Sequence, residues 1–91
     1  MATRARDDVR VVAVVNPTKL DGGRYDRHWL EHAAARLGAT HVGWCETTPE
    51  ETGRGLAAAA VRDGAATVLA WGGDGTVRAC AAGVYDATRA G

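Results

Sequence analysis

The stretch Gly72-Gly73-Asp74-Gly75-Thr76 contains three glycines around a single carboxylate. Glycine loses more backbone entropy on folding than any other residue, so a turn of this composition is costly to form. Without side chains, the backbone can approach a ligand closely and adopt positive φ angles, and successive N–H groups can then hold an anion. The stretch therefore predicts an anion-binding loop, and a plain tight turn is the alternative.

Asp74 and Thr76 indicate which kind of anion the loop would bind. Asp74 is unsuited to direct contact with a phosphate, but a magnesium ion between the carboxylate and the phosphate would remove the conflict. Thr76 can donate its hydroxyl to a phosphate oxygen, or cap a helix that we expect to begin near it. The N-terminus of that helix adds partial positive charge. The loop has neither the Walker pattern nor the GxGxxG fingerprint of dinucleotide sites.

Three segments rich in apolar and β-branched residues predict the strands that must position this loop, over about Val9–Val15, Thr40–Glu46 and Ala66–Trp71. Helical spacing and helix start and stop signals predict helices over Tyr25–Leu37, from Thr48 to Gly64, and from Thr76 to about Ala87. The alternation of strands and helices predicts an α/β fold with a parallel sheet, right-handed crossovers and helices on both faces.

Three loops are expected to meet at one edge of this sheet, because ligands bind beyond the carboxyl ends of parallel strands. They begin at Asn16, at Thr47-Thr48 and at Gly72. Asn16-Pro17 can also be explained as a strand terminator, since proline cannot continue a central strand. Lys19 can contact a phosphate or remain a solvated surface charge.

The segment that opens the second predicted helix has a good start signature. Thr48 can act as the N-cap, Pro49 suits the first helical position, and Glu50 and Glu51 are favoured by the helix dipole. Thr48 and Glu51 also have the spacing of a capping box. The same threonine can contact a ligand, because a cap and a ligand site need not exclude each other.

Two other groups of reactive residues have simpler explanations. His28, Glu31 and His32 have the spacing of a zinc pattern, but a solvated helix face explains them better without a third ligand. Cys45 and Cys80 lack a nearby partner and are expected to be small core residues. Without a disulfide framework, a reducing cytoplasm is the expected location.

The charge balance restricts the class of partner. Eleven basic residues match eleven acidic ones, which gives no electrostatic case for binding nucleic acid or an anionic membrane surface. The longest apolar run, Val11 to Val15, is too short to cross a bilayer. An alanine-rich chain of 91 residues can form one small domain, and its exposed apolar surface makes a homodimer a further expectation.

Several short motifs together resemble the diacylglycerol kinase catalytic domain, a family that shares its nucleotide-binding fold with NAD kinases. They are "GGDGTV" after the strand "TVLAW", "VVNPTK" at the end of the first strand, and "ETTPEE" before the second helix. The resemblance extends from about Val9 to Gly91 and implies a three-layer α/β sandwich with a short parallel sheet.

The resemblance also assigns roles to residues. It implies that Asn16, Pro17, Thr18 and Lys19 line the nucleotide ATP, that Thr48 contacts it from the second loop, and that Gly72, Gly73, Asp74, Gly75 and Thr76 wrap its phosphates. Asp74 would serve the Mg²⁺ of Mg-ATP and would be the catalytic residue of this part. The family usually has a polar residue and then glutamate where Arg78 and Ala79 stand here, so any role of that glutamate is missing.

The implied reaction moves the γ-phosphoryl group of ATP to the hydroxyl of a diacylglycerol-type lipid acceptor. Residues 1–91 would be the ATP-binding part of the catalytic domain, without the C-terminal domain that holds the lipid site and the general base. We therefore expect this part to be inactive alone, and the full-length protein to be cytoplasmic or peripheral at the membrane. An NAD kinase-like enzyme and a non-catalytic nucleotide-binding domain are the alternatives.

Overall fold

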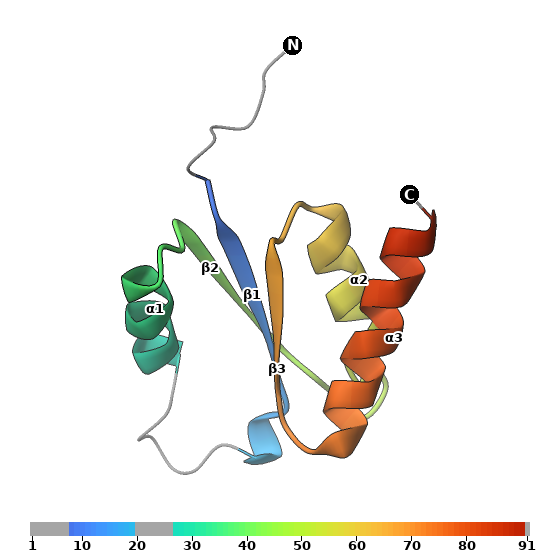
Figure 1. Cartoon of the computed structure of the whole chain (residues 1–91). Coiled ribbons are helices and arrows are strands. Elements are labelled where there is room, and N and C mark those ends of the chain that lie inside the picture. The colour runs from blue at the N-terminus through green and yellow to red at the C-terminus, as the bar shows by residue number, and fades with distance from the viewer. Residues whose placement is uncertain (1–7, 20–26, 91) are drawn as a thin grey trace.

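A computed structural model describes residues 8–19 and 27–90. Figure 1 shows how the described elements follow one another along the chain. They are β1 (Arg10–Val15), the short 3-10 helix η1 (Pro17–Lys19), α1 (Arg27–Arg36), β2 (His41–Glu46), α2 (Arg54–Arg62), β3 (Thr67–Trp71) and α3 (Asp74–Ala90).

The described strands form one parallel sheet in the order β2-β1-β3, so the first strand is central. Its residues Ala13, Val14 and Val15 are fully buried, as the dense β-branched run predicts for a strand covered on both faces. Val15 lies opposite Glu46 of β2 and Trp71 of β3. The three strands therefore end at the same level, and the loops that follow them begin side by side.

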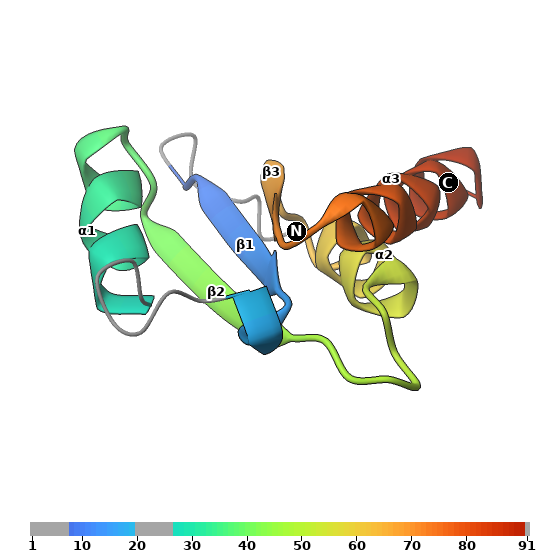
Figure 2. The same cartoon turned by 90° about the horizontal axis from the view of Figure 1, so that it is seen from below.

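Helices cover both faces of the sheet, which confirms the α/β three-layer architecture. Figure 2 shows α1 on one side of the sheet and the pair α2 and α3 on the other. The α1 side buries a core of Ala13, Val15, Leu30 and their apolar neighbours. The other side buries Val14, Ala57 and Cys80, each from a different element.

Cys80 acts as a small core residue, as expected. It is 4% exposed. Burial raises the pKa of its thiol, and the nearby charge of Glu51 raises it further, so the thiol stays protonated at neutral pH. A reactive thiolate at this position is therefore disfavoured.

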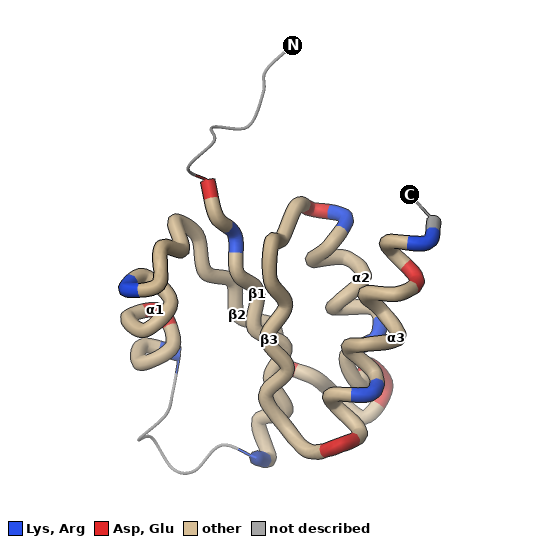
Figure 3. The backbone as a smooth tube through the Cα atoms, in the orientation of Figure 1, with Lys and Arg blue, Asp and Glu red and all other residues tan. Residues whose placement is uncertain are grey.

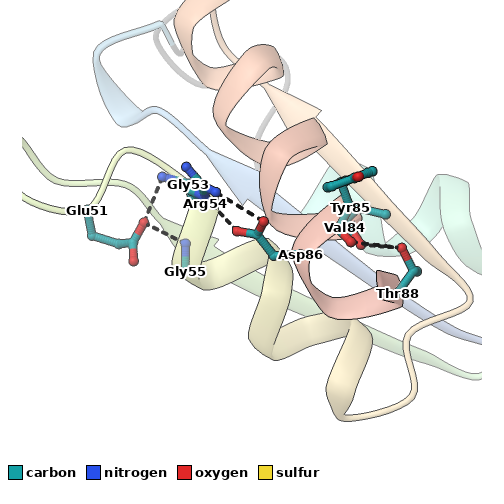
Figure 4. Close-up of polar contacts among 8 residues, drawn as sticks. All are labelled: Glu51, Gly53, Arg54, Gly55, Val84, Tyr85, Asp86 and Thr88. Carbon is teal, nitrogen blue, oxygen red and sulfur yellow. Dashed lines mark hydrogen bonds and ion pairs between the residues drawn. The ribbon is translucent and has the colours of Figure 1, made fainter. Parts of the chain in front are cut away.

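The start of α2 is joined to α3 by an ion pair and a close backbone contact. Arg54 donates two hydrogen bonds to the Asp86 carboxylate, at 2.6 and 3.0 Å, as drawn in Figure 4. These bonds lower the pKa of Asp86 and raise the pKa of Arg54. A Cβ on Gly83 would collide with the backbone carbonyl of Arg54 and lie 3.1 Å from the Ala57 side chain.

We expect Gly83→Ala to destabilise the fold by about 1–3 kcal/mol, because the added methyl must push α2 and α3 apart. Urea unfolding followed by circular dichroism measures the loss. Gly75→Ala on the same helix is the matched control, since a Cβ there meets no atom within 4 Å. Equal stability of Gly83→Ala and the wild-type chain would mean that the two helices are not packed as closely as described.

The two helices beside the predicted loops begin at other residues than expected. The second helix begins at Arg54, not after Thr48. The third begins at Asp74, two residues before the expected start at Thr76, and continues to Ala90. The first two residues of the predicted helix Tyr25–Leu37 lie outside the described residues.

Candidate functional site

A cavity of about 530 Å³ lies at the carboxyl ends of the strands. It is bounded by the loop after β1, the loop after β2 and the first turn of α3. Its lining residues are Asn16, Pro17, Thr18, Thr47, Thr48, Pro49, Thr52, Gly75 and Thr76. The three loops that the sequence predicted to meet at one edge are thus brought together around a single pocket.

The loop after β1 is closed on itself and attached to β3. The Asn16 side-chain oxygen accepts hydrogen bonds from the Thr18 backbone N–H at 3.0 Å and from the Thr18 hydroxyl at 2.7 Å. The backbone N–H of Asn16 donates to the Trp71 carbonyl at 2.8 Å. This asparagine therefore both ends the strand and fixes the first pocket wall, so its two proposed roles are compatible.

Lys19 does not line the pocket but lies against the glycine turn. Its Cε is 3.7 Å from where a Cβ on Gly73 would be. The backbone N–H of Lys19 donates to the Asn16 carbonyl at 3.0 Å. The lysine is thus held beside the turn that leads into α3.

The glycines of the turn act differently from the sequence prediction. Among the described residues only Gly38, Gly53 and Gly64 have positive φ, so the expected positive φ in the turn after β3 is wrong. At Gly72 a Cβ would lie 2.5 Å from the Thr76 hydroxyl and 3.0 Å from the Asn16 Cβ. The close approach that requires glycine there is to the protein itself.

Gly75, by contrast, faces open space. A Cβ there would meet no atom within 4 Å, and the residue lines the pocket. Glycine is therefore not required by packing at this position, and the free space next to its backbone is available to a ligand.

The N-terminus of α3 supplies backbone donors to this space. The N–H groups of Thr76 and Val77 donate to the Gly73 carbonyl, at 3.0 and 3.2 Å. Those of Asp74 and Gly75 have no acceptor within the part of the chain that the structure describes. The first N–H groups of a helix lack intrahelical acceptors and favour an anion. Asp74 is exposed in the same turn.

The loop after β2 is fixed by its own hydrogen bonds. Thr47 donates its N–H to the Val15 carbonyl at 2.8 Å. The Thr48 hydroxyl accepts the Glu51 N–H at 3.0 Å, and the Thr48 N–H donates to the Glu51 carbonyl at 2.8 Å. This pair closes a turn well before α2. The residue at the N-cap position is Gly53, which has no side-chain cap bond.

The prediction that Thr48 caps the second helix is therefore wrong. Half of the expected capping box exists, because the threonine hydroxyl accepts the N–H three residues later. The Glu51 carboxylate does not return to Thr48 but bonds the N–H groups of Gly53 and Gly55, at 2.9 and 3.1 Å. It is this glutamate that caps α2.

Thr48→Ala should consequently leave α2 intact and cost less than the roughly 1 kcal/mol typical of a lost N-cap, because its hydroxyl supports only an exposed turn. Helix content and the urea midpoint measure this. Thr40→Ala is a reference for losing a hydroxyl that bonds the backbone elsewhere, at Val9. A large loss of helix content in Thr48→Ala would restore the threonine as a cap.

The pocket gathers six of the residues assigned to the nucleotide site: Asn16, Pro17, Thr18, Thr48, Gly75 and Thr76. Lys19, Gly72, Gly73 and Asp74 lie beside it without lining it. Thr47, which was expected at this edge as the start of the second loop, also lines it, and so do Pro49 and Thr52, which were not assigned to the site from the sequence. Their position in a polar loop directly after a strand is the signal that could have identified them.

No cluster of three or more His, Cys, Asp or Glu side chains is placed to hold a metal ion among the described residues. The His28, Glu31 and His32 pattern lies on α1, where both histidines are exposed and Glu31 is paired with Arg27 at 3.2 Å. Figure 3 shows basic and acidic residues interspersed along the chain. Local groups such as Asp74 and Lys19 must therefore set the electrostatics of the pocket.

Comparison with known protein families identifies the family to which these loops and this sheet belong. The model of the diacylglycerol kinase catalytic domain matches residues 10–90, which include the whole sheet and all three pocket loops. The chain belongs to this family. No curated protein and no solved structure gives a significant match. Membership in the diacylglycerol kinase catalytic domain family indicates a kinase with a lipid kinase-like function.

Within the described ranges, every helix is too short or too polar to cross a membrane.

Proposed function

We propose that this chain is the ATP-binding part of a lipid kinase that transfers the γ-phosphoryl group of ATP to the hydroxyl of a diacylglycerol-type lipid. The observation that carries the proposal is the open N-terminus of α3 at Gly75, which faces a pocket built from two polar loops. A phosphate group fits such an end of a helix because donors and dipole both favour it.

The nucleotide would occupy the pocket with its phosphates toward α3. Asn16, Pro17, Thr18 and Thr48 line the remaining walls, and Lys19 lies close enough to the turn at Gly73 to reach a phosphate oxygen. A pocket of about 530 Å³ is in the range typical of small-molecule and cofactor sites.

The residues present suit a magnesium ion that is bound through the nucleotide. A carboxylate at Asp74 would repel a bare triphosphate, whereas oxygen ligands from a carboxylate and phosphates are those that Mg²⁺ prefers. When bound, the metal would neutralise charge on the transferring phosphoryl group.

The contribution of these residues to catalysis would be positioning and charge neutralisation. The N–H groups of Asp74 and Gly75 would hold phosphate oxygens, and Asp74 would place the metal. A general base from residues outside this chain would accept the proton of the lipid hydroxyl. We therefore propose that the chain binds Mg-ATP weakly and does not transfer phosphate alone.

The topology indicates where a strand that followed α3 would lie. The crossover from β2 to β3 passes over β1, and its helix α2 lies on the same face as α3. Because crossovers between parallel strands are right-handed, a strand following α3 would continue in the same direction and pair with the open edge of β3. An apolar groove that includes Trp29, Leu37 and Leu69 lies beside that edge.

The proposed activity is tested with a protein that contains this chain within a complete catalytic domain. Labelled phosphate transfer from ATP to diacylglycerol in mixed micelles is measured with NAD as a competing acceptor. Transfer to the lipid is expected. Preferred transfer to NAD would instead support an NAD kinase-like enzyme, and ATP binding without transfer to either acceptor would support a non-catalytic nucleotide-binding domain.

A further inference from the structure

Glu51, in the loop after β2, turns its side chain away from the pocket. Thr47, Thr48, Pro49 and Thr52 line the cavity, whereas Glu51 does not. Its carboxylate reaches back to the start of α2, where one oxygen accepts the N–H groups of two glycines at 2.9 and 3.1 Å, as Figure 4 shows.

The backbone of the same glutamate closes the pocket wall. Its N–H donates to the Thr48 hydroxyl and its carbonyl accepts the Thr48 N–H. Glu51 is thus bonded through its backbone to the loop and through its side chain to α2. Because Gly53 provides no side-chain cap, the glutamate is also the charged group that the N-terminus of this helix favours.

The start of α2 is itself fixed relative to α3. Arg54 is paired with Asp86, and Gly53 is buried with φ of 130°, so close to the core that a Cβ would lie 3.2 Å from the Cys80 sulfur. α3 carries the opposite pocket wall, Gly75 and Thr76. Through α2, Glu51 therefore links the two walls between which a ligand would lie.

We infer that Glu51 is a positioning residue of this pocket, whose carboxylate sets the distance between the loop after β2 and the N-terminus of α3. The inference rests on the proposed function for the identity of the ligand, Mg-ATP. The positioning of the loop itself does not depend on that identity.

Gly55 offers a second way to displace the carboxylate without changing Glu51. A Cβ on Gly55 would collide with the Glu51 Oε1 and lie 3.2 Å from its Cδ. Gly55 is within α2 and its φ is not positive, so alanine would otherwise favour the helix. The cost of Gly55→Ala should therefore depend on whether the glutamate is present.

The test compares Glu51→Ala, Glu51→Gln, Gly55→Ala and the double variant Glu51→Ala/Gly55→Ala. Mg-ATP affinity is measured by calorimetry, and backbone amide exchange of residues 47–52 by NMR. We expect Glu51→Ala and Gly55→Ala each to weaken Mg-ATP binding about tenfold and to speed exchange in the loop. Glu51→Gln should retain most of the affinity, because its amide oxygen can accept the same N–H groups.

The double variant should bind Mg-ATP no more weakly than Glu51→Ala does. It should also be more stable than Gly55→Ala, because alanine at position 55 then no longer meets a carboxylate. Glu50→Ala is the matched control: it removes an adjacent exposed carboxylate that does not line the pocket, and it should leave affinity and exchange unchanged.

Additive effects of the two substitutions, or unchanged exchange in Glu51→Ala, would overturn the positioning role. Failure of the wild-type chain to bind Mg-ATP would instead contradict the proposed function, and the exchange measurement would still decide the role of Glu51. If Glu51→Ala does not fold, Glu51→Gln and Gly55→Ala provide the same comparison. A loss in Glu51→Gln as large as in Glu51→Ala would also contradict the hydrogen-bond account.

Discussion

Asp74→Ala in a kinase that contains this chain is expected to reduce phosphoryl transfer about 100- to 1000-fold, the range for loss of one preorganised electrostatic group. Asp74 is the only acidic residue of the stretch 72–76, and at the start of α3 it lies beside the N–H groups that would hold phosphate oxygens. Without it, the metal would lose the protein ligand proposed for it, and the developing charge on the phosphoryl group would be less well neutralised.

Initial rates at saturating lipid, measured over a range of magnesium concentrations, test this expectation. Asp63→Ala is the control. It removes an exposed carboxylate at the C-terminal end of α2 and should leave the rate unchanged. Transfer by Asp74→Ala at near the wild-type rate would exclude the role proposed for this carboxylate, while the fold would stand.

Gly75→Val is expected to lower Mg-ATP affinity more than tenfold (about 1.4 kcal/mol per factor of ten) while changing the free energy of unfolding by less than about 1 kcal/mol. The space next to Gly75 is free of protein atoms within 4 Å. A valine side chain can therefore enter this space without moving neighbouring residues. The side chain would, however, occupy the position proposed for a phosphate.

Gly72→Ala should show the opposite distribution of effects. Its methyl would lie 2.5 Å from the Thr76 hydroxyl, so the turn must shift and stability should fall by about 1–3 kcal/mol. Calorimetric ATP titrations and urea unfolding of both variants separate the two outcomes. Unchanged affinity in Gly75→Val would show that the phosphates do not lie at this turn of α3.

The central strand could be predicted closely from the sequence, because a strand buried on both faces is a dense apolar run. β1 occupies Arg10–Val15, against a predicted Val9–Val15. The order of strands and helices then limits the topology to a parallel sheet. It also brings the carboxyl ends of the strands together at one edge.

The start of α2 could not be predicted because two local signals compete. Thr48 and Pro49 form a good start signature, yet the Glu51 carboxylate bonds N–H groups further along the chain. Contacts with residues distant in sequence, such as that of Arg54 with Asp86 of α3, hold the start of α2, and neither local signal contains them.

The pocket could be predicted only in part, for a related reason. Sequence motifs identify the loops that meet but not which side chains of a loop turn inward. Thr52 faces the cavity whereas its neighbour Glu51 turns away. The role of Gly72 also depends on a neighbour distant in sequence, because a Cβ there would lie 3.0 Å from the Asn16 Cβ as well as 2.5 Å from the nearby Thr76 hydroxyl.

Binding of Mg-ATP in this pocket can be tested by NMR titration of the ¹⁵N-labelled chain with ATP, with and without magnesium. We predict amide shift changes at millimolar ATP that depend on magnesium and concentrate at residues 16–19, 47–52 and 72–76. Shifts of equal size without magnesium would contradict the role of Asp74. No shifts at these residues, or shifts confined to the groove between α1 and β3, would contradict the site.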